Sequence, residues 1–337
     1  MLPALGLTSW FSLMHGSLAP ERLLRLVQKA GYSELAVTDL EGLHGLPELV
    51  SLAEEYALKL VAGTSFTESG SRLYVWAESR EGFGALCSLL TAIKFDGPGL
   101  GAAVSRNGAE GLVFAGTDFA LLRDLADRGA RNVFVALESG TAMYRMAGKA
   151  REAGIPTIAV VRGSWHDIHD KDRLRILEAI DRRCRVTDME KDWGDHQPRL
   201  PSLEEALAEF SAFPEAVREA ACLAARAIHA KQCFSASPVF PAYRGMSCEE
   251  AAHELGRRAR SAVPSRYGKS RPDVEARLAR ELSIIQSKGF SAYFLVVQDI
   301  VSLCPRTCGR GSGASSIVSY LLGITHLDPL LHDLFFE

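Results

Sequence analysis

Short β-forming runs alternate with amphipathic helical stretches through the first half of this chain, and this alternation restricts the fold more than any other feature. The runs that read as strands span residues 34–38, 59–63, 72–77, 111–116, 132–137 and 156–161. Helical patterns lie near residues 20–31, 45–57, 80–92, 118–128, 141–154 and 171–182. Such alternation predicts an α/β fold with a mostly parallel sheet, either open or closed into a barrel.

The pattern changes in the second half. A polar, turn-rich stretch at 185–202 precedes helices across 203–230, and residues 234–246 are rich in proline and small residues with little periodicity. This composition is typical of a domain linker. Beyond it, residues 273–290 carry one apolar stripe and end near Gly289, which predicts an amphipathic helix. We therefore expect a first domain over 1–233, a linker over 234–246 and a second domain over 247–337.

Bulk composition narrows the class of protein. Hydrophobic residues make up 47% and charged residues 23%, as in a soluble globular protein. The net charge of −3 provides no overall electrostatic footprint for nucleic acid, so contact with DNA would need a local patch. The basic run at 257–277 is the best such patch, with a solvated helix face as the alternative. Seven scattered cysteines and the absence of a long apolar run predict a cytoplasmic protein without a membrane partner.

A glycine-rich segment near the C-terminus suggests an anion site. The sequence CGRGSGASSIVSYLLGIT begins at Cys308, and its glycines lead straight into an apolar helical run. Backbone N–H groups in such a turn can approach a phosphate, and a helix N-terminus adds partial positive charge. With a guanidinium and a hydroxyl, the predicted cradle comprises Gly309, Arg310, Gly311 and Ser312. A plain turn before a helix is the alternative.

The surroundings of this turn carry a family resemblance. Residues 289–301 (GFSAYFLVVQDIV) and 309–337 (GRGSGASSIVSYLLGITHLDPLLHDLFFE) resemble the start of the palm in bacterial C-family DNA polymerases, the alpha subunit of DNA polymerase III. In that family the turn holds the triphosphate of the incoming nucleotide, and metal-binding aspartates follow further on. The chain ends before those aspartates. Its stretch between Asp299 and Gly309 is several residues short, so we expect the loop before the cradle to differ.

The N-terminal region is similar to the polymerase-and-histidinol-phosphatase (PHP) domain that begins those polymerases. Residues 11–45 and 72–91 carry the likeness, which is closest to the error-prone branch. The resemblance implies a PHP-type distorted (β/α)7 barrel, followed by a mostly helical segment and the beginning of a palm domain.

An active PHP domain binds metal ions through histidines and carboxylates at the strand ends, in motifs of the form H-x-H, T-D-H, G-x-E and D-x-H. The positions of this chain that align with those motifs are Gly6, Thr8, Asp39, Leu40, Ser65, Arg162 and Ser164, with His15 where the polymerase branch often has an aspartate. Glycine, leucine and arginine supply no ligand, whereas a metal cluster needs several nitrogen and oxygen donors. We therefore predict a degenerate site without metal.

Two remnant metal sites remain open on the sequence alone. His15, Asp39 and His44 could form one, although a hydrogen-bonded Asp39 that anchors its strand end is the alternative. The stretch WHDIHD, with His166 and His169, could form another, and a solvated loop before a helix is its alternative.

The leading hypothesis is the N-terminal portion of a DNA-directed DNA polymerase acting in replication or translesion synthesis. The resemblance implies DNA and deoxynucleoside triphosphates as substrates of the intact polymerase and Mg²⁺ as its cofactor. It also implies a proofreading exonuclease or other replisome proteins as possible partners of the barrel. We expect this chain alone to bind no cofactor and to be inactive. A stand-alone metal-dependent phosphoesterase and a non-catalytic replisome scaffold are the alternatives.

Overall fold

The computed structural model describes residues 1–68, 70–97, 99–189, 198–234, 240–269, 271–304 and 306–336. The chain divides into two compact units, Met1–Ser235 and Ala236–Glu337. Each unit is described by itself. Parts of the predicted linker, at 235–239, and of the turn-rich stretch, at 190–197, lie outside the described residues.

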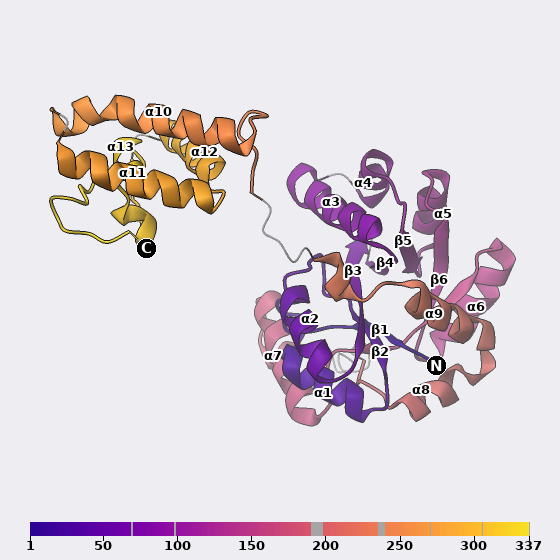
Figure 1. Ribbon diagram of the computed structural model, residues 1–337. Helices are drawn as coiled ribbons and strands as arrows, with labels where there is room; N and C mark the ends of the chain where they lie inside the picture. Colours follow the sequence, from indigo (N-terminus) through magenta and orange to yellow (C-terminus); the bar gives the residue numbers. More distant parts are fainter. Residues whose placement is uncertain are drawn as a thin grey trace. The chain divides into compact units, whose positions relative to one another are not determined.

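The first unit is built on one sheet of eight strands (Figure 1). The order across the sheet is β7-β6-β5-β4-β3-β2-β1-β8, and all neighbours are parallel except the β3–β4 and β4–β5 pairs. The strands are β1 Ala4–Leu7, β2 Glu34–Val37, β3 Lys59–Glu68, β4 Ser71–Ala77, β5 Leu112–Gly116, β6 Asn132–Glu138, β7 Thr157–Val160 and β8 Arg162–Gly163.

The sheet closes on itself because β7 and β8 are two halves of one extended run. Only Val161 separates them, and β7 pairs with β6 while β8 pairs with β1. The N–H groups of Gly6 and Thr8 donate to the carbonyls of Val161 and Gly163, each at 2.9 Å. If β7 and β8 are counted as one run, the barrel has seven strands, as the family resemblance implied.

Helices cover the barrel in the order expected from the strand–helix alternation (Figure 1). They are α1 Pro20–Lys29, α2 Leu46–Glu55, α3 Arg80–Asp96, α4 Leu100–Asn107, α5 Phe119–Asp127, α6 Ala142–Ala153, α7 Ile168–Asp181, α8 Leu203–Glu209 and α9 Pro214–Arg226. The sequence patterns did not predict α4. The strand expected at 59–63 extends to Glu68 because its second half pairs with β4 in a hairpin.

Aromatic side chains of β4 fill the barrel. Trp76 and Tyr74 are fully buried and stack with ring centroids 5.7 Å apart. The Trp76 indole N–H donates to the carbonyl of Leu5 at 3.1 Å, which ties β4 to β1. Gly63 makes room for this ring, because a Cβ there would lie 2.6 Å from the Trp76 ring.

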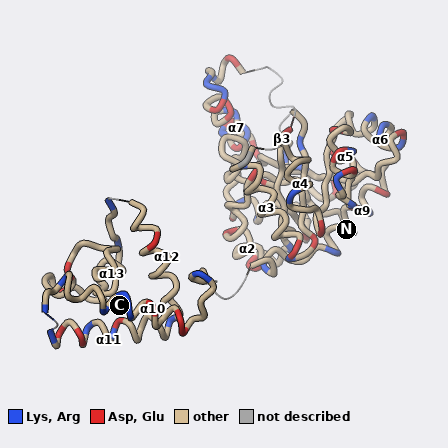
Figure 2. Tube along the Cα trace, turned by 90° about the horizontal axis from the view of Figure 1, so that it is seen from above, with Lys and Arg blue, Asp and Glu red and all other residues tan. Residues whose placement is uncertain are grey.

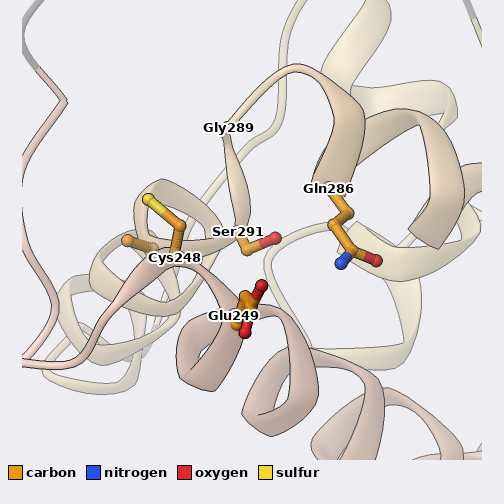
Figure 3. A pocket seen from close by; sticks show the side chains of 6 residues that line it. Cys248, Glu249, Gln286, Gly289 and Ser291 are labelled. Carbon is orange, nitrogen blue, oxygen red and sulfur yellow. The ribbon is translucent and has the colours of Figure 1, made fainter.

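The second unit is helical. It contains α10 Cys248–Tyr267, α11 Pro272–Ser287, α12 Ser291–Ser302, the 3₁₀ turn η5 Ser312–Ser315 and the short α13 Ile317–Leu321. Its core joins Leu255, Leu278, Leu295, Ile317 and Val318. A pocket of about 180 Å³ lies where the start of α10 meets the α11–α12 junction, and Figure 3 shows its lining residues Cys248, Glu249, Gln286, Gly289 and Ser291.

None of the helices in the described ranges is long and apolar enough to cross a membrane.

Candidate functional sites at the barrel mouth and the glycine-rich turn

A cavity of about 710 Å³ opens at the barrel mouth, where the carboxyl ends of the strands meet. This is where the sequence placed the PHP site. Basic and acidic side chains both line the cavity, with hydroxyl groups between them. The lining residues are His15, Leu40, Thr67, Gly70, Ser71, Arg72, Thr117, Glu138, Arg162, Glu178, Asp181 and Arg182.

Asp39 is buried at the end of β2, and its carboxylate is occupied by the first turn. Oδ1 accepts from the Ser9 backbone N–H at 2.8 Å and from the Ser12 hydroxyl at 2.7 Å. Oδ2 accepts from the Ser9 hydroxyl at 2.7 Å. Burial raises the pKa of Asp39, and the hydrogen bonds from Ser9 and Ser12 oppose part of that rise. Asp39 therefore anchors the end of β2, which was the alternative to a remnant metal site.

His15 interacts with α7. Its Nε2 lies 3.9 Å from Asp181 Oδ2 at the end of that helix. The remnant site proposed for His15, Asp39 and His44 gains no support from these contacts. Among the described residues, no group of three or more histidine, cysteine, aspartate or glutamate side chains is arranged to hold a metal ion.

Arg162 occupies the barrel mouth as a fixed cation. Its Nη1 donates to Glu138 Oε2 at 2.8 Å, and the Tyr74 hydroxyl donates to Glu138 Oε1 at 2.6 Å. Both members of the ion pair are about four-fifths buried, with exposed side-chain fractions of 19% and 21%. Burial, together with the nearby Glu138 carboxylate, raises the pKa of Tyr74, so its hydroxyl stays protonated and donates. Tyr74 and Glu138 had not been predicted as mouth residues.

The remaining aligned positions make hydrogen bonds or bridges with backbone groups at the strand ends. The hydroxyl of Ser65 donates to the carbonyl of Thr38 at 2.9 Å, and Ser164 N–H donates to the carbonyl of Pro198 at 3.0 Å. Gly6 and Thr8 join β1 to the run 157–163, and Leu40 bridges to Ser65. The aligned positions therefore lie together at the strand ends, but their donor chemistry does not fit a metal cluster.

The stretch WHDIHD forms the start of α7. Asp167 is the N-cap, and Asp170 completes a capping box with it. Arg22 of α1 contacts both carboxylates, at 2.6 Å from Asp167 and 2.9 Å from Asp170. His166 and His169 are exposed. The helix begins at Ile168, three residues before the predicted start, because of this cap.

The glycine-rich turn is exposed in the second unit. Gly311 has a φ of 68°, a backbone conformation that favours glycine, and Arg310 and Ser312 are exposed. Gly309 packs closely on the C-terminal side of α13, since a Cβ there would lie 2.6 Å from Thr325 Cγ2. A mainly apolar cavity of about 250 Å³ lies beside the turn, and Tyr293, Phe294 and Val297 of α12 line it together with Gly309 and Arg310.

One part of the phosphate-cradle prediction is wrong: the turn does not lead straight into an α-helix. The 3₁₀ turn η5 intervenes, and α13 begins only at Ile317. The Ser316 hydroxyl accepts from Ser319 N–H at 3.1 Å, and Glu281 Oε2 lies 3.4 Å from Val318 N–H. The N–H groups of Val318 and Ser319 are thus engaged within the protein, so the proposed anion site depends mainly on the turn itself.

Four arginines of the basic run at 257–277 form ion pairs with nearby carboxylates. Arg257 and Arg258 both pair with Glu254, Arg271 pairs with Asp273, and Arg277 pairs with Glu281. Figure 2 shows acidic and basic residues interleaved along α10 and α11. These contacts favour the solvated helix face over a phosphate-binding stripe.

Comparison with known families identifies the class. Residues 5–120 match the PHP domain, and residues 253–337 match the bacterial DNA polymerase III alpha NTPase domain. The molecule therefore joins a PHP-class barrel to a DNA polymerase III alpha segment.

The relatives of the whole chain are error-prone DNA polymerases. Error-prone DNA polymerase 1 of Agrobacterium fabrum is 27% identical over 365 residues, covering 99% of this chain and 33% of the relative. The error-prone DNA polymerase of Cutibacterium acnes is 30% identical over 389 residues, covering 98% and 33%. Nearly the whole chain is thus homologous to error-prone DNA polymerases, and residues 253–337 match the DNA polymerase III alpha family. The chain spans about a third of the length of these relatives.

A solved amidohydrolase from Chromobacterium violaceum is also similar, at 12% identity and a TM-score of 0.35 over 50% of this chain and 89% of that one.

Proposed function

We propose that this chain is the N-terminal portion of a DNA-directed DNA polymerase in which the glycine-rich turn helps to bind the triphosphate of an incoming nucleotide. The observation that carries the proposal is the exposed turn itself, inside the segment that matches the polymerase family. Arg310 offers a guanidinium, Ser312 a hydroxyl, and Gly311 a backbone that lets an anion approach closely.

The barrel belongs to this proposal as a non-catalytic domain. Asp39 accepts three hydrogen bonds from Ser9 and Ser12, and Arg162 places a cation where an active PHP domain would hold metal. A guanidinium repels a metal ion and cannot ligate it. We propose that the barrel has lost phosphoesterase chemistry.

Because the relatives are DNA polymerases, we propose the same substrate classes for the intact protein. DNA and deoxynucleoside triphosphates would be the substrates of the intact polymerase, with Mg²⁺ as its cofactor. No residue of this chain is assigned to hold that ion. A proofreading exonuclease or another replisome protein bound to the barrel remains a proposal without a defined surface.

Triphosphate binding tests the turn. We expect the chain to bind inorganic triphosphate in titration calorimetry, and Arg310→Ala to weaken binding by about tenfold or more, because charge-assisted hydrogen bonds to phosphate are lost. Arg306→Ala is the matched control, since Arg306 is a nearby exposed arginine before the turn. Equal affinity of the wild-type chain and Arg310→Ala would refute the assignment of the turn.

A primer-extension assay and a phosphoesterase assay test whether the chain alone is catalytically inactive. We expect no template-directed extension and no phosphoesterase turnover by the chain alone with Mg²⁺, Mn²⁺ or Zn²⁺. Metal-dependent extension would contradict the proposal. Metal-dependent hydrolysis of a phosphomonoester would instead revive the stand-alone phosphoesterase.

A further inference from the structure

A buried carboxylate lies behind the glycine-rich turn. Glu281 of α11 is 1% exposed, and its Oε2 accepts from the Ser316 hydroxyl at 2.7 Å. Ser316 is itself fully buried and immediately precedes α13. A buried charge is costly unless it is paired and hydrogen-bonded. The contact therefore fixes the position of Ser316 relative to α11.

Arg277 neutralises the Glu281 carboxylate and also binds two backbone carbonyls outside α11. Its Nε donates to Glu281 Oε1 at 2.6 Å, one helical turn away on α11. Its Nη2 donates to the carbonyl of Ser315 at 3.3 Å and to that of Leu334 at 2.9 Å. A single arginine thus joins α11, the end of η5 and the C-terminal segment.

These contacts reach the turn through its own backbone. Ser316 N–H donates to the carbonyl of Gly313 at 3.4 Å, and Ala314 N–H donates to the carbonyl of Gly311 at 3.1 Å. Residues 310–313 of the turn are exposed, whereas Gly309 is half-buried and packs against Thr325. The contacts at 315–316 therefore restrain the C-terminal side of the turn.

We propose that Arg277 and Glu281 are positioning residues for the triphosphate-binding turn. The inference rests on the proposed function of that turn and goes beyond it, because neither residue is offered to the ligand. Glu281 holds Ser316, and Arg277 cancels a negative charge that would otherwise lie behind an anion site. A preorganised turn binds an anion more tightly because less conformational freedom is lost on binding.

The test measures two quantities on the same variants of the whole chain. Titration with inorganic triphosphate gives the affinity. Hydrogen–deuterium exchange of the peptide covering 309–321 reports the order of the turn without any ligand. Thermal unfolding of each variant sets a temperature at which all of them are folded.

We expect Glu281→Ala to weaken triphosphate binding by about tenfold and to accelerate exchange in residues 309–321, because it releases Ser316. Glu281→Gln keeps an oxygen for the Ser316 hydroxyl, so its loss should stay within about threefold. Glu254→Ala is the matched control, because Glu254 also accepts from two arginines but only within α10. It should leave both measurements unchanged.

If Glu281→Ala does not fold, Ser316→Ala provides the same test with a smaller change. It removes the hydroxyl contact and leaves the Arg277–Glu281 pair, and we expect weaker binding and faster exchange again. Unchanged exchange in both Glu281→Ala and Ser316→Ala would overturn the inference. A wild-type chain that does not bind triphosphate would instead refute the proposed function, while the exchange data would still decide whether the anchor orders the turn.

Discussion

At the scale of single residues, Asp39 shows that a carboxylate, which is a common metal ligand, can instead accept hydrogen bonds that stabilise the fold. Its two oxygens receive three hydrogen bonds, all from the turn that follows β1. The Ser12 hydroxyl also accepts from Leu40 N–H at 2.9 Å, so the turn and the end of β2 hold each other. Three of the roughly four acceptor sites of this carboxylate are therefore used within the fold, two on Oδ1 and one on Oδ2.

Removal of this carboxylate should be costly. We expect Asp39→Ala to lower the free energy of unfolding by about 3 kcal/mol, because buried donors of Ser9 and Ser12 lose their acceptor. Asp39→Asn keeps one acceptor oxygen, and the serine hydroxyls can rotate, so its cost should be below about 1 kcal/mol. Urea denaturation measures both values. Equal costs for the two variants would show that the hydrogen bonds are not what matters.

The pKa of Asp39 gives a pH dependence with a definite sign. Burial raises this pKa, so the folded state binds the proton more readily than the unfolded chain does. The stability contributed by Asp39 therefore falls as the pH rises from about 4 through the raised pKa. We expect the difference in unfolding free energy between wild type and Asp39→Asn to decrease over this interval and then to level off. A difference that grows with pH would mean that the three hydrogen bonds outweigh burial.

At the scale of elements, close backbone contacts set the position of α3. A Cβ on Gly82 would lie 2.2 Å from the carbonyl oxygen of Gly111, whereas a Cβ on Gly84 would meet nothing within 4 Å. Both glycines lie in the same helix, two residues apart. Gly82 is thus required by the approach of the loop before β5, and Gly84 is not.

These two glycines form a matched pair. We expect Gly84→Ala to stabilise the protein by about 0.5–1 kcal/mol, because alanine is the better helix former. Gly82→Ala should destabilise it by about 2 kcal/mol or more, because backbone has to move away from the new methyl group. Thermal and urea unfolding would measure both. A stabilising Gly82→Ala would show that α3 can shift freely.

At the scale of the whole molecule, the two units carry separate hydrophobic cores. The buried cluster of the first unit runs from Leu2 to Cys233, and that of the second runs from Tyr243 to Leu322. Neither cluster contains a residue of the other. A mutation in one core can therefore change the stability of that unit alone. The bounds of the linker at 234–246 stay a prediction.

We expect calorimetry to resolve two unfolding transitions. Asp39→Ala should lower only the transition of the barrel unit. Ser247→Ala should lower only that of the helical unit, by about 1 kcal/mol, because Ser247 caps α10 in a capping box with Glu250. A single transition that both variants shift equally would mean that the units unfold as one cooperative body.

Local patterns in the sequence determined a good part of this protein. Strand–helix alternation predicted a mostly parallel sheet, open or closed, and the family resemblance implied a barrel. The identity of Gly6, Leu40 and Arg162 predicts a poor metal site, because missing donor atoms cannot be supplied by folding, and this stays a prediction. The glycine and arginine content of the turn predicts an anion site, and this too stays a prediction. The sequence also contains a sign that Glu281 is buried, because this charged residue lies on the apolar stripe between Leu278 and Ile285.

Which groups meet depends on the packing of the whole chain and not on local sequence. Asp39 is 30 residues from Ser9, Arg162 is 24 from Glu138, and Ser316 is 35 from Glu281. Barrel closure likewise depends on the one residue, Val161, at which a single extended run changes its partner from β6 to β1. Periodicity reports which face of an element is buried, but hydrogen-bond partners at such separations are chosen by packing of the whole chain, so no local pattern contains them.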